Sequence, residues 1–471
     1  MSIPKHGPIP RTVRRLQEFS VPLIAGVVMA LLVANVDERL YHTLVQAPIP
    51  QALAALFSSE DSGTAIAMVG PGHQVAALAG AAASHHAHGD VPDGTADEQA
   101  AGEQTGHSLT SLGFLINDIF MVFFFGIAAK EITESCLPGG ALNPPAKAIN
   151  PLLGTAGGVL GPIGVYFVLN AIMGQDAWAR GWGIPTATDI ALAWLGARLI
   201  FGAGHPAISF LLLLAIADDA IGLGIIAFAY PDPHHPVQWF HTAWILPGIA
   251  LAFGLRKKNV QAWWPYVLFG GGLAWWGLYS AHLHPALALV FIVPFIPGPK
   301  RDLGLYLDDA DPSHAPSPLE KFEHDIKLAV DGGLFFFAFA NAGVPFSGIS
   351  NLTWIVLAAL VIGKTGGITL FAYVGSLLGF PLPQGMTMRH LVVTAMIAGL
   401  GLTVALFVSN QAFSDAQMQG AAKMGALLSA SAGLLAFVLA QALGVGALAE
   451  SGRCPSGWPG RRFGKSPTPS T

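Results

Sequence analysis

Long apolar stretches recur along the whole chain, and they constrain its fold more than any other feature. A stretch of about 17 to 25 apolar residues is long enough to cross the hydrocarbon core of a bilayer, about 30 Å, as a helix. Inside lipid, a helix also satisfies its own backbone hydrogen bonds. We place twelve such stretches at approximately 19–36, 111–129, 151–174, 181–200, 206–230, 239–255, 261–279, 285–297, 326–346, 353–378, 390–412 and 423–446.

Polar residues are too few for a soluble protein of this size. Of the 471 residues, 53% are hydrophobic and only 11% are charged, whereas an ordinary soluble domain is about 25% charged. We therefore predict an all-α polytopic membrane protein with about twelve transmembrane helices in a lipid bilayer. The net charge of -5, without a dense basic block, argues against nucleic acid as a partner. The distant Cys136 and Cys454 match neither a disulfide framework nor a thiolate metal site.

Lysine and arginine are distributed unequally between the predicted loops. Cytoplasmic loops carry an excess of these residues. Nineteen, including Lys130, fall on the side of both termini, one (Lys364) lies within a span, and three lie opposite: Arg39, Arg180 and Lys423. This distribution predicts twelve spans with both termini in the cytoplasm.

Polar segments flank and interrupt the predicted twelve-helix domain of residues 19–446. We expect a cytoplasmic N-terminal segment at 1–18 and a disordered cytoplasmic tail at 447–471. Between the first two spans, residues 58–107 are rich in Ala, Gly, His and acids, and we expect a long periplasmic loop of low complexity there.

The 58–107 segment contains a histidine-rich tract, SHHAHGD, with His85, His86, His88 and Asp90 close together. Such a tract can bind a transition metal. A flexible polar loop is the favoured interpretation, because low-complexity segments need no fixed geometry.

Four ionisable residues lie where a bilayer would exclude water: Asp189, Asp218, Asp219 and Lys364. Each costs about 2.5 to 3.5 kcal/mol at the centre of a membrane helix. We therefore expect them to face an interior cavity and one another. Neighbours on a helix point about 100° apart, so one of the two adjacent aspartates should meet Lys364 and the other should face the cavity.

The adjacent aspartates favour ion exchange over a purely structural role. Two carboxylates in a low-dielectric site repel each other, so a proton bound there can be traded for a metal cation. The alternative is a buried ion-pair network that holds helices together. A structural pair needs one acid and one base, whereas this chain supplies three acids.

The segment around Asp189 carries the signals of an interrupted helix. Pro185 removes a backbone donor, and irregular backbone at membrane depth is tolerated only where it lines protein or water. The freed carbonyls and the Thr188 hydroxyl are hard oxygen donors, which suit a small cation. The alternative is an ordinary proline kink with Asp189 as a helix cap.

A second interruption is predicted at Gly399 and Gly401, in the eleventh span. The first lies in the fourth span, so each is the middle member of a triplet, spans three to five and spans ten to twelve, and the triplets have opposite orientation. Paired interruptions of this kind indicate an inverted-repeat transporter with its site near the midplane. We expect the two interrupted helices to cross there.

Several motifs follow one another in the chain: GWGIPTATDIAL, the ADD of the fifth span, EKFEHDIK, FAFANAGV, LVIGKTGGITLF and GLGLTVALF. In this order, and over nearly all of 19–446, the chain resembles the NhaA family of Na+/H+ antiporters, itself an established example of inverted-repeat transporters. The resemblance implies a protein of the bacterial inner membrane that exchanges Na+ or Li+ for H+ without a cofactor.

The resemblance also implies roles for individual residues. Asp219 resembles the family's cation-binding and proton-releasing carboxylate. Asp218 resembles the neighbour of that carboxylate, which pairs with the lysine that Lys364 resembles. Asp189 and Thr188 are similar to residues at the crossing of the two interrupted helices.

Further positions resemble parts of the family's cation passage and pH response. Acids of the passage correspond to Asp118 and Glu131. A cytoplasmic pH-responsive cluster corresponds to Glu323, His324 and Lys327.

His284 resembles a histidine near the outer contact between two subunits, which implies a homodimer as the candidate assembly. The chain also departs from the family pattern. ITES follows Glu131 where the family has a basic pair and a glutamate, and Lys327 stands where the family often has a second histidine. The 58–107 segment is longer than the hairpin that joins two subunits in the best-known members.

Together these observations predict an electrogenic, pH-regulated antiporter that exports Na+ and Li+, with cations and protons competing for Asp218 and Asp219. An ion channel is one alternative, but it needs neither an internal lysine nor two interrupted helices. An intramembrane protease is another, although the chain has no HExxH motif. The third alternative is a carrier of an anionic solute, similar to bile-acid carriers. Such a carrier should have cationic groups at its site, whereas this chain supplies mainly acidic residues.

Overall fold

A computed structural model describes residues 21–51, 111–138, 145–202, 204–230, 236–299 and 316–445, with backbone alone for 145–147. The predicted N-terminal segment 1–18, the loop 58–107 with its histidine-rich tract, and the tail 447–471 lie outside the described residues. Within the described ranges the chain is helical, and the only strand-like pairing is an isolated bridge between Pro48 and Ser111.

The described chain is a succession of α-helices with short 3-10 and π-helical segments, labelled η. In order these are α2 (Val21–Val36), α3 (Glu38–Gln46), α5 (Leu112–Phe114), η1 (Leu115–Phe120), α6 (Met121–Ser135), α7 (Pro145–Met173), η2 (Asp176–Thr186), α8 (Ile190–Phe201), α9 (Pro206–Ala229), η3 (Trp239–Trp244), α10 (Ile245–Lys257), η4 (Tyr266–Gly271), α11 (Gly272–Ser280), η5 (Pro285–Phe291), η6 (Val293–Phe295), α12 (Pro318–Ala342), η7 (Phe346–Gly348), α13 (Asn351–Ala358), η8 (Ala359–Gly363), α14 (Lys364–Leu377), α15 (Met388–Ala398), α16 (Thr403–Ala412), α17 (Ala416–Leu428) and α18 (Ser431–Leu443).

A helical segment lies at each of the twelve predicted stretches, but the end of the second differs from the prediction. The helix continues through α6 to Ser135 instead of ending near residue 129. Lys130, which was assigned to a cytoplasmic loop, therefore lies within a helix. The helix continues because Ala, Lys and Glu are good helix formers, and the first proline after it is Pro138.

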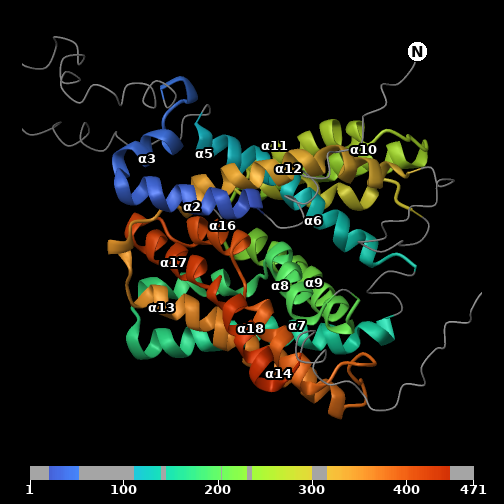
Figure 1. The fold of residues 1–471 in the computed structure, drawn as a ribbon. Coiled ribbons are helices and arrows are strands. Elements are labelled where there is room, and N and C mark those ends of the chain that lie inside the picture. The colour runs from blue at the N-terminus through green and yellow to red at the C-terminus, as the bar shows by residue number, and fades with distance from the viewer. Residues whose placement is uncertain are drawn as a thin grey trace, which may run out of the picture.

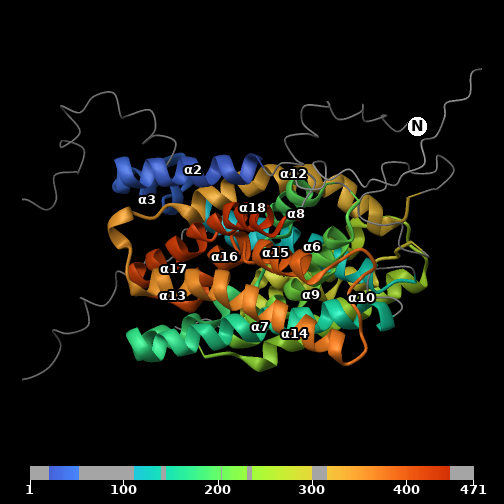
Figure 2. The same cartoon turned by 60° about the horizontal axis from the view of Figure 1, so that its bottom comes forward.

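The helices pack as two bundles, one above the other in Figure 1. The flanking bundle comprises α2 to α6 and α10 to α12, and α2 lies along α12 at the top of Figure 2. The site bundle comprises α7 to α9 and α13 to α18 with η2 and η8, and α7 lies along α14 at the bottom of that view. Both predicted triplets therefore pack in a single bundle.

Glycines bring the backbones of α7 and α14 together. A Cβ atom on Gly157 would lie 2.1 Å from the carbonyl oxygen of Gly367, and one on Gly161 would lie 2.3 Å from that of Gly363. The four-residue spacing places both glycines of each segment on one face, as in the small-residue motifs of membrane helices. Because Lys364 directly follows Gly363, this packing also holds the lysine in the interior of the bundle.

The outer faces of the helices are apolar. Val28, Leu32, Phe228 and Ile362 are 51% to 80% exposed there, whereas soluble proteins rarely expose large apolar patches. Five helices of the described chain are long and apolar enough to cross a membrane, or seven if each of two bent helix pairs forms one span. These features fit an α-helical polytopic membrane protein.

We expect Gly367→Ala to lower the thermal stability of the protein, because its methyl group would lie 2.0 Å from the Gly157 carbonyl oxygen. Overpacking typically costs about 1 to 3 kcal/mol, and a backbone atom cannot move aside as a flexible side chain can. The measurement is the Tm of the purified protein in detergent, followed by tryptophan fluorescence. Gly164→Ala, on the partner helix α7, is the control because nothing outside its own helix backbone lies within 4 Å of the added methyl group. An equal loss in both variants would contradict this account.

Candidate functional site

Two bent helix pairs meet in the site bundle. The axes of η2 and α8 differ by 55°, and those of α15 and α16 differ by 49°. Non-helical backbone separates the helices of each pair, at 187–189 and at 399–402. The Asp189 N–H donates to the Leu400 carbonyl at 2.7 Å, so a backbone hydrogen bond joins one break directly to the other.

The Asp189 carboxylate caps a helix on each side of this junction. Its Oδ1 accepts from the Leu192 N–H of α8 at 3.1 Å, and its Oδ2 accepts from the Thr403 N–H of α16 at 3.3 Å. Helix N-termini carry partial positive charge and unpaired N–H groups. One buried carboxylate thus caps two helix N-termini. The cap on α8 is the contact expected from the alternative of a proline kink, and the cap on α16 is an additional one.

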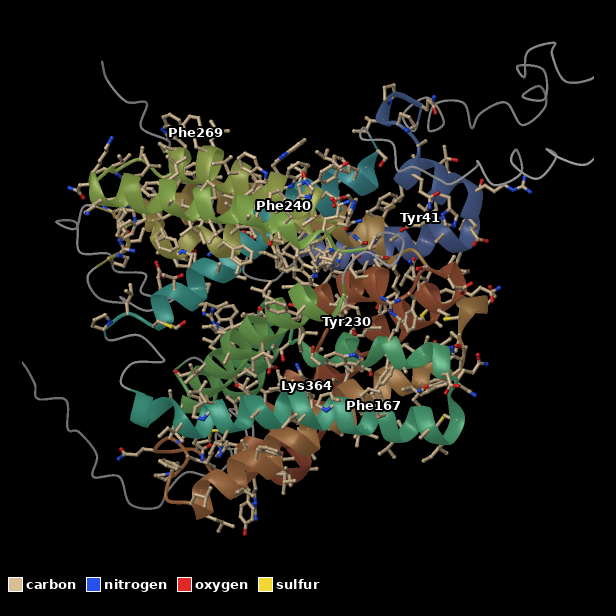
Figure 3. The ribbon with its side chains drawn as sticks, turned by 180° about the vertical axis from the view of Figure 1, so that it is seen from behind. Tyr41, Phe167, Tyr230, Phe240, Phe269 and Lys364 are labelled. Atoms are coloured by element: carbon tan, nitrogen blue, oxygen red, sulfur yellow. The ribbon has the colours of Figure 1, made fainter. Side chains whose placement is uncertain are left out.

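Asp218, Lys364 and Thr188 form a buried polar cluster. Lys364 Nζ lies 2.9 Å from Asp218 Oδ2, and both side chains are fully buried. Lys364 also donates to the Thr188 hydroxyl at 2.6 Å. That hydroxyl has one hydrogen and two acceptors in reach, Asp218 Oδ2 at 2.9 Å and the Ala398 carbonyl at 3.0 Å. The cluster therefore ties α9 and α14 to both breaks, and Figure 3 shows Lys364 in the interior of the lower bundle.

Asp219 faces away from this cluster, toward the junction of the two bundles. It borders a cavity of about 10 Å³ together with Phe124 and Phe125 of α6, Leu223 of α9 and Val404 of α16. This volume is about that of one water-sized probe sphere. The buried Asp219 Oδ1 has no hydrogen-bond partner among the described residues. The expected division between the adjacent aspartates is thus visible in the contacts, with Asp218 at the lysine and Asp219 at a cavity.

A second charged cluster surrounds Lys130 on α6. Its Nζ lies 2.7 Å from Glu134, 3.2 Å from Glu131 and 2.5 Å from Glu323 of α12. Lys327 contacts Glu323 from the solvent side at 3.3 Å. The structure thus brings three of the predicted residues together around a lysine that sequence analysis had treated as a loop cation. One sequence feature could have predicted this contact: Lys130 and Glu134 are four residues apart, a spacing that puts opposite charges on one face of a helix.

Two lysines set the electrostatics of Glu323 in this cluster. Glu323 lies ahead of the predicted ninth span, 326–346. Burial alone would raise the pKa of the Glu323 carboxyl, but the ammonium groups of Lys130 and Lys327 outweigh this effect and hold the pKa below its usual value. The predicted cluster member His324 lies apart, because its side chain is 75% exposed and its polar contact among the described residues is with its neighbour Asp325, at 3.5 Å.

Asp118 also lies apart from both clusters, in the π-helical segment η1. Its carbonyl accepts from the Trp275 indole N–H at 3.2 Å.

Asn117, which precedes Asp118, belongs to a row of side-chain amides that sequence analysis did not identify. Asn341 of α12 donates to Asn117 Oδ1 at 3.0 Å, and Asn410 of α16 donates to Asn341 Oδ1 at 2.5 Å. This row links the flanking bundle to the second bent pair.

His284 lies at the start of η5 and reaches toward the site bundle. Its Nε2 contacts the carbonyl oxygen of Tyr230, and its ring packs edge-on against Phe407 at a centroid distance of 6.0 Å. These contacts lie within one chain, and the role of His284 at a subunit contact stays a prediction.

Comparison with known proteins gives one consistent family. The family model described as Na+/H+ antiporter 1 matches residues 62–442. A Na(+)/H(+) antiporter NhaA of Geobacter sulfurreducens is 51% identical over 92% of this chain and 98% of its own length. That of Desulfitobacterium hafniense is also 51% identical, over 92% of this chain and 97% of its own. The Jannaschia protein of the same name is 38% identical over 89% of this chain and 95% of its own.

These matches cover the helices that carry both charged clusters and both bent pairs. Because the family model matches most of the chain and the relatives align over nearly their full lengths, the chain belongs to the Na+/H+ antiporter 1 family, to which the NhaA antiporters belong.

Proposed function

We propose that this chain exchanges Na+ or Li+ for H+, electrogenically and under control of pH, at a site formed by Asp218 and Asp219. The observation that carries the proposal is the unequal environment of the two carboxylates. Asp218 is held by Lys364 and Thr188, whereas Asp219 has a buried oxygen without a partner beside a cavity of about 10 Å³. A buried carboxylate without a partner is costly unless it binds a proton or a cation.

Protons and cations compete for the same carboxylate oxygens in this scheme. At low pH Asp219 is protonated and has little affinity for Na+. As the cytoplasmic pH rises, Asp219 loses its proton and a cation binds to its oxygens, after which the Asp218–Lys364 pair loosens. Exchange moves net charge across the membrane only if a second proton leaves for each Na+ that binds. The Lys364 ammonium can release that proton once its pair with Asp218 loosens.

The fold provides the setting for alternating access. We propose that all twelve helical segments cross the inner membrane, that both termini are cytoplasmic, and that the two bent pairs are interrupted helices of inverted repeats that cross near the midplane. The Asp189–Leu400 hydrogen bond and the double cap by Asp189 support this arrangement. The cluster with Glu131, Glu323 and Lys327 would then shape the pH response at the cytoplasmic side.

Asp219→Asn should abolish exchange, because an amide cannot alternate between binding a proton and balancing a cation. The assay uses everted membrane vesicles with an acid interior, in which the fluorescence of a pH dye recovers when NaCl or LiCl is added. Asp176→Asn, at an exposed carboxylate of η2, is the matched control and should retain exchange. Normal Na+-driven proton movement in Asp219→Asn, at normal membrane abundance, would rule out the proposal.

Lys364→Met should destabilise the protein by about 3 to 5 kcal/mol, because it leaves the buried Asp218 charge without compensation. Adding Asp218→Asn to Lys364→Met should recover part of this loss, since the orphaned charge is then removed. The measurement is a double-mutant cycle of thermal unfolding in detergent. Strictly additive losses would show that the two side chains, 2.9 Å apart, are not coupled.

A further inference from the structure

The Lys130 ammonium occupies the centre of a group of carboxylates. Its side chain is only 5% exposed, and its Nζ lies within 2.5 to 3.2 Å of one oxygen from each of three glutamates, Glu131, Glu134 and Glu323. An ammonium group has three N–H donors. Each donor thus has one carboxylate within reach, and the lysine is enclosed by oxygens as a small monovalent cation would be.

The carboxylates of this group outnumber the cations near them. Among the described residues, the only other cation in contact with the group is Lys327, through Glu323, so these two lysines leave one negative charge uncompensated when all three glutamates are ionised. Glu131 Oε2 and Glu134 Oε1 are buried without a hydrogen-bond partner among the described residues. The group therefore has spare oxygen ligands even with Lys130 in place.

The charged neighbours of the group come from few elements. Among the described elements packed against α6, α12 supplies Glu323 and Lys327, the more distant Asp331, and Glu320, Lys321, His324 and Asp325. η1 supplies Asp118, α9 supplies Asp218 and Asp219, and η5 and η6 have no ionisable side chain. Within the part of the chain that the structure describes, Lys130 and Lys327 are thus the lysines that contact the three glutamates.

The Lys130 group lies close to the cavity beside Asp219. Ala128, two residues before Lys130, borders that cavity. Ala129 borders a larger apolar cavity of about 310 Å³, and Leu223 borders both. A cation held firmly by the three glutamates would therefore be retained within a few residues of the exchange site.

We propose that the Lys130 ammonium is a resident cation: it takes the place among Glu131, Glu134 and Glu323 that Na+ would otherwise occupy, so that transported cations bind at Asp219 and are not retained beside it. This inference rests on the proposed function. Lys130 acts as a positioning residue, because it keeps the three carboxylates together and their ligand positions filled.

Removal of the ammonium should convert the group into a Na+ site. In Lys130→Met three carboxylates remain around an empty position, and their repulsion is relieved by binding a proton or a cation. We expect purified Lys130→Met/Asp219→Asn to show a Tm that rises with NaCl relative to choline chloride at the same ionic strength, since a ligand that binds only the folded state stabilises it. Asp219→Asn alone and Lys130→Arg/Asp219→Asn should show no such rise.

The exchange assay provides the second test. With Asp219 intact, Lys130→Met should lower the rate at saturating Na+ and shift the pH profile, because cations or protons are now retained at the glutamates. Lys130→Arg, which keeps the charge, should stay close to wild type. A purely structural role would instead lower the amount of folded protein without creating Na+-dependent stability.

Two outcomes would overturn the inference. In the first, the Tm of Lys130→Met/Asp219→Asn does not respond to Na+. In the second, the Tm of Lys130→Arg/Asp219→Asn rises with Na+ by the same amount. If Lys130→Met does not fold, Lys130→Met/Glu134→Gln, with one buried charge fewer, is tested in the same way. The binding test uses the Asp219→Asn background, so normal exchange by Asp219→Asn itself would refute the proposed function without affecting this result.

Discussion

The ion pair of Asp218 and Lys364 is the interaction on which the rest of the structure depends. Taking two charges out of water costs several kcal/mol for each ion, and the cost is recovered only when the partners are held at hydrogen-bond distance. Here Nζ and Oδ2 are 2.9 Å apart, and Thr188 contacts both side chains. Three segments must therefore converge: α9 with the aspartate, α14 with the lysine, and the break after η2 with the threonine. The glycine contact of α7 with α14 makes this convergence possible, because only backbone separates the two helices there.

The adjacent aspartates differ because α9 lies at the boundary between two bundles. Thr188 and Lys364, which hydrogen-bond Asp218, both belong to the site bundle. Asp219, one residue further, borders a cavity whose wall is shared by Phe124 of the flanking bundle and Val404 of the site bundle. Two equal side chains thus acquire different surroundings from a rotation of about 100° about one helix.

Much of the architecture could be predicted because membrane helices follow local rules. Apolar length located the twelve helical segments, and the cost of charge in lipid singled out Asp189, Asp218, Asp219 and Lys364 as interior residues. The expectation that all four face one another was wrong, because only Asp218 and Lys364 form a pair, while Asp189 caps two helices and Asp219 borders a cavity. The predicted end of the second helix near residue 129 was wrong, because good helix formers extend α6 beyond the apolar residues to Ser135. The twelve crossings, the orientation of the termini and the residue roles stay predictions.

The sequence by itself determined that the chain is helical, that it is suited to lipid, and that a few ionisable groups must meet inside it, because these properties depend on composition and on spacing along one helix. Only the tertiary structure decided which partners meet. It gave Asp218 rather than Asp219 to Lys364, placed one Asp189 carboxylate on two helix N-termini, and surrounded Lys130 with glutamates from α6 and α12. The contacts of Asp218 with Lys364, of Asp189 with Thr403 and of Lys130 with Glu323 join segments that are distant in the chain. The rotation and depth of one helix against another arise from packing, which local sequence patterns do not encode.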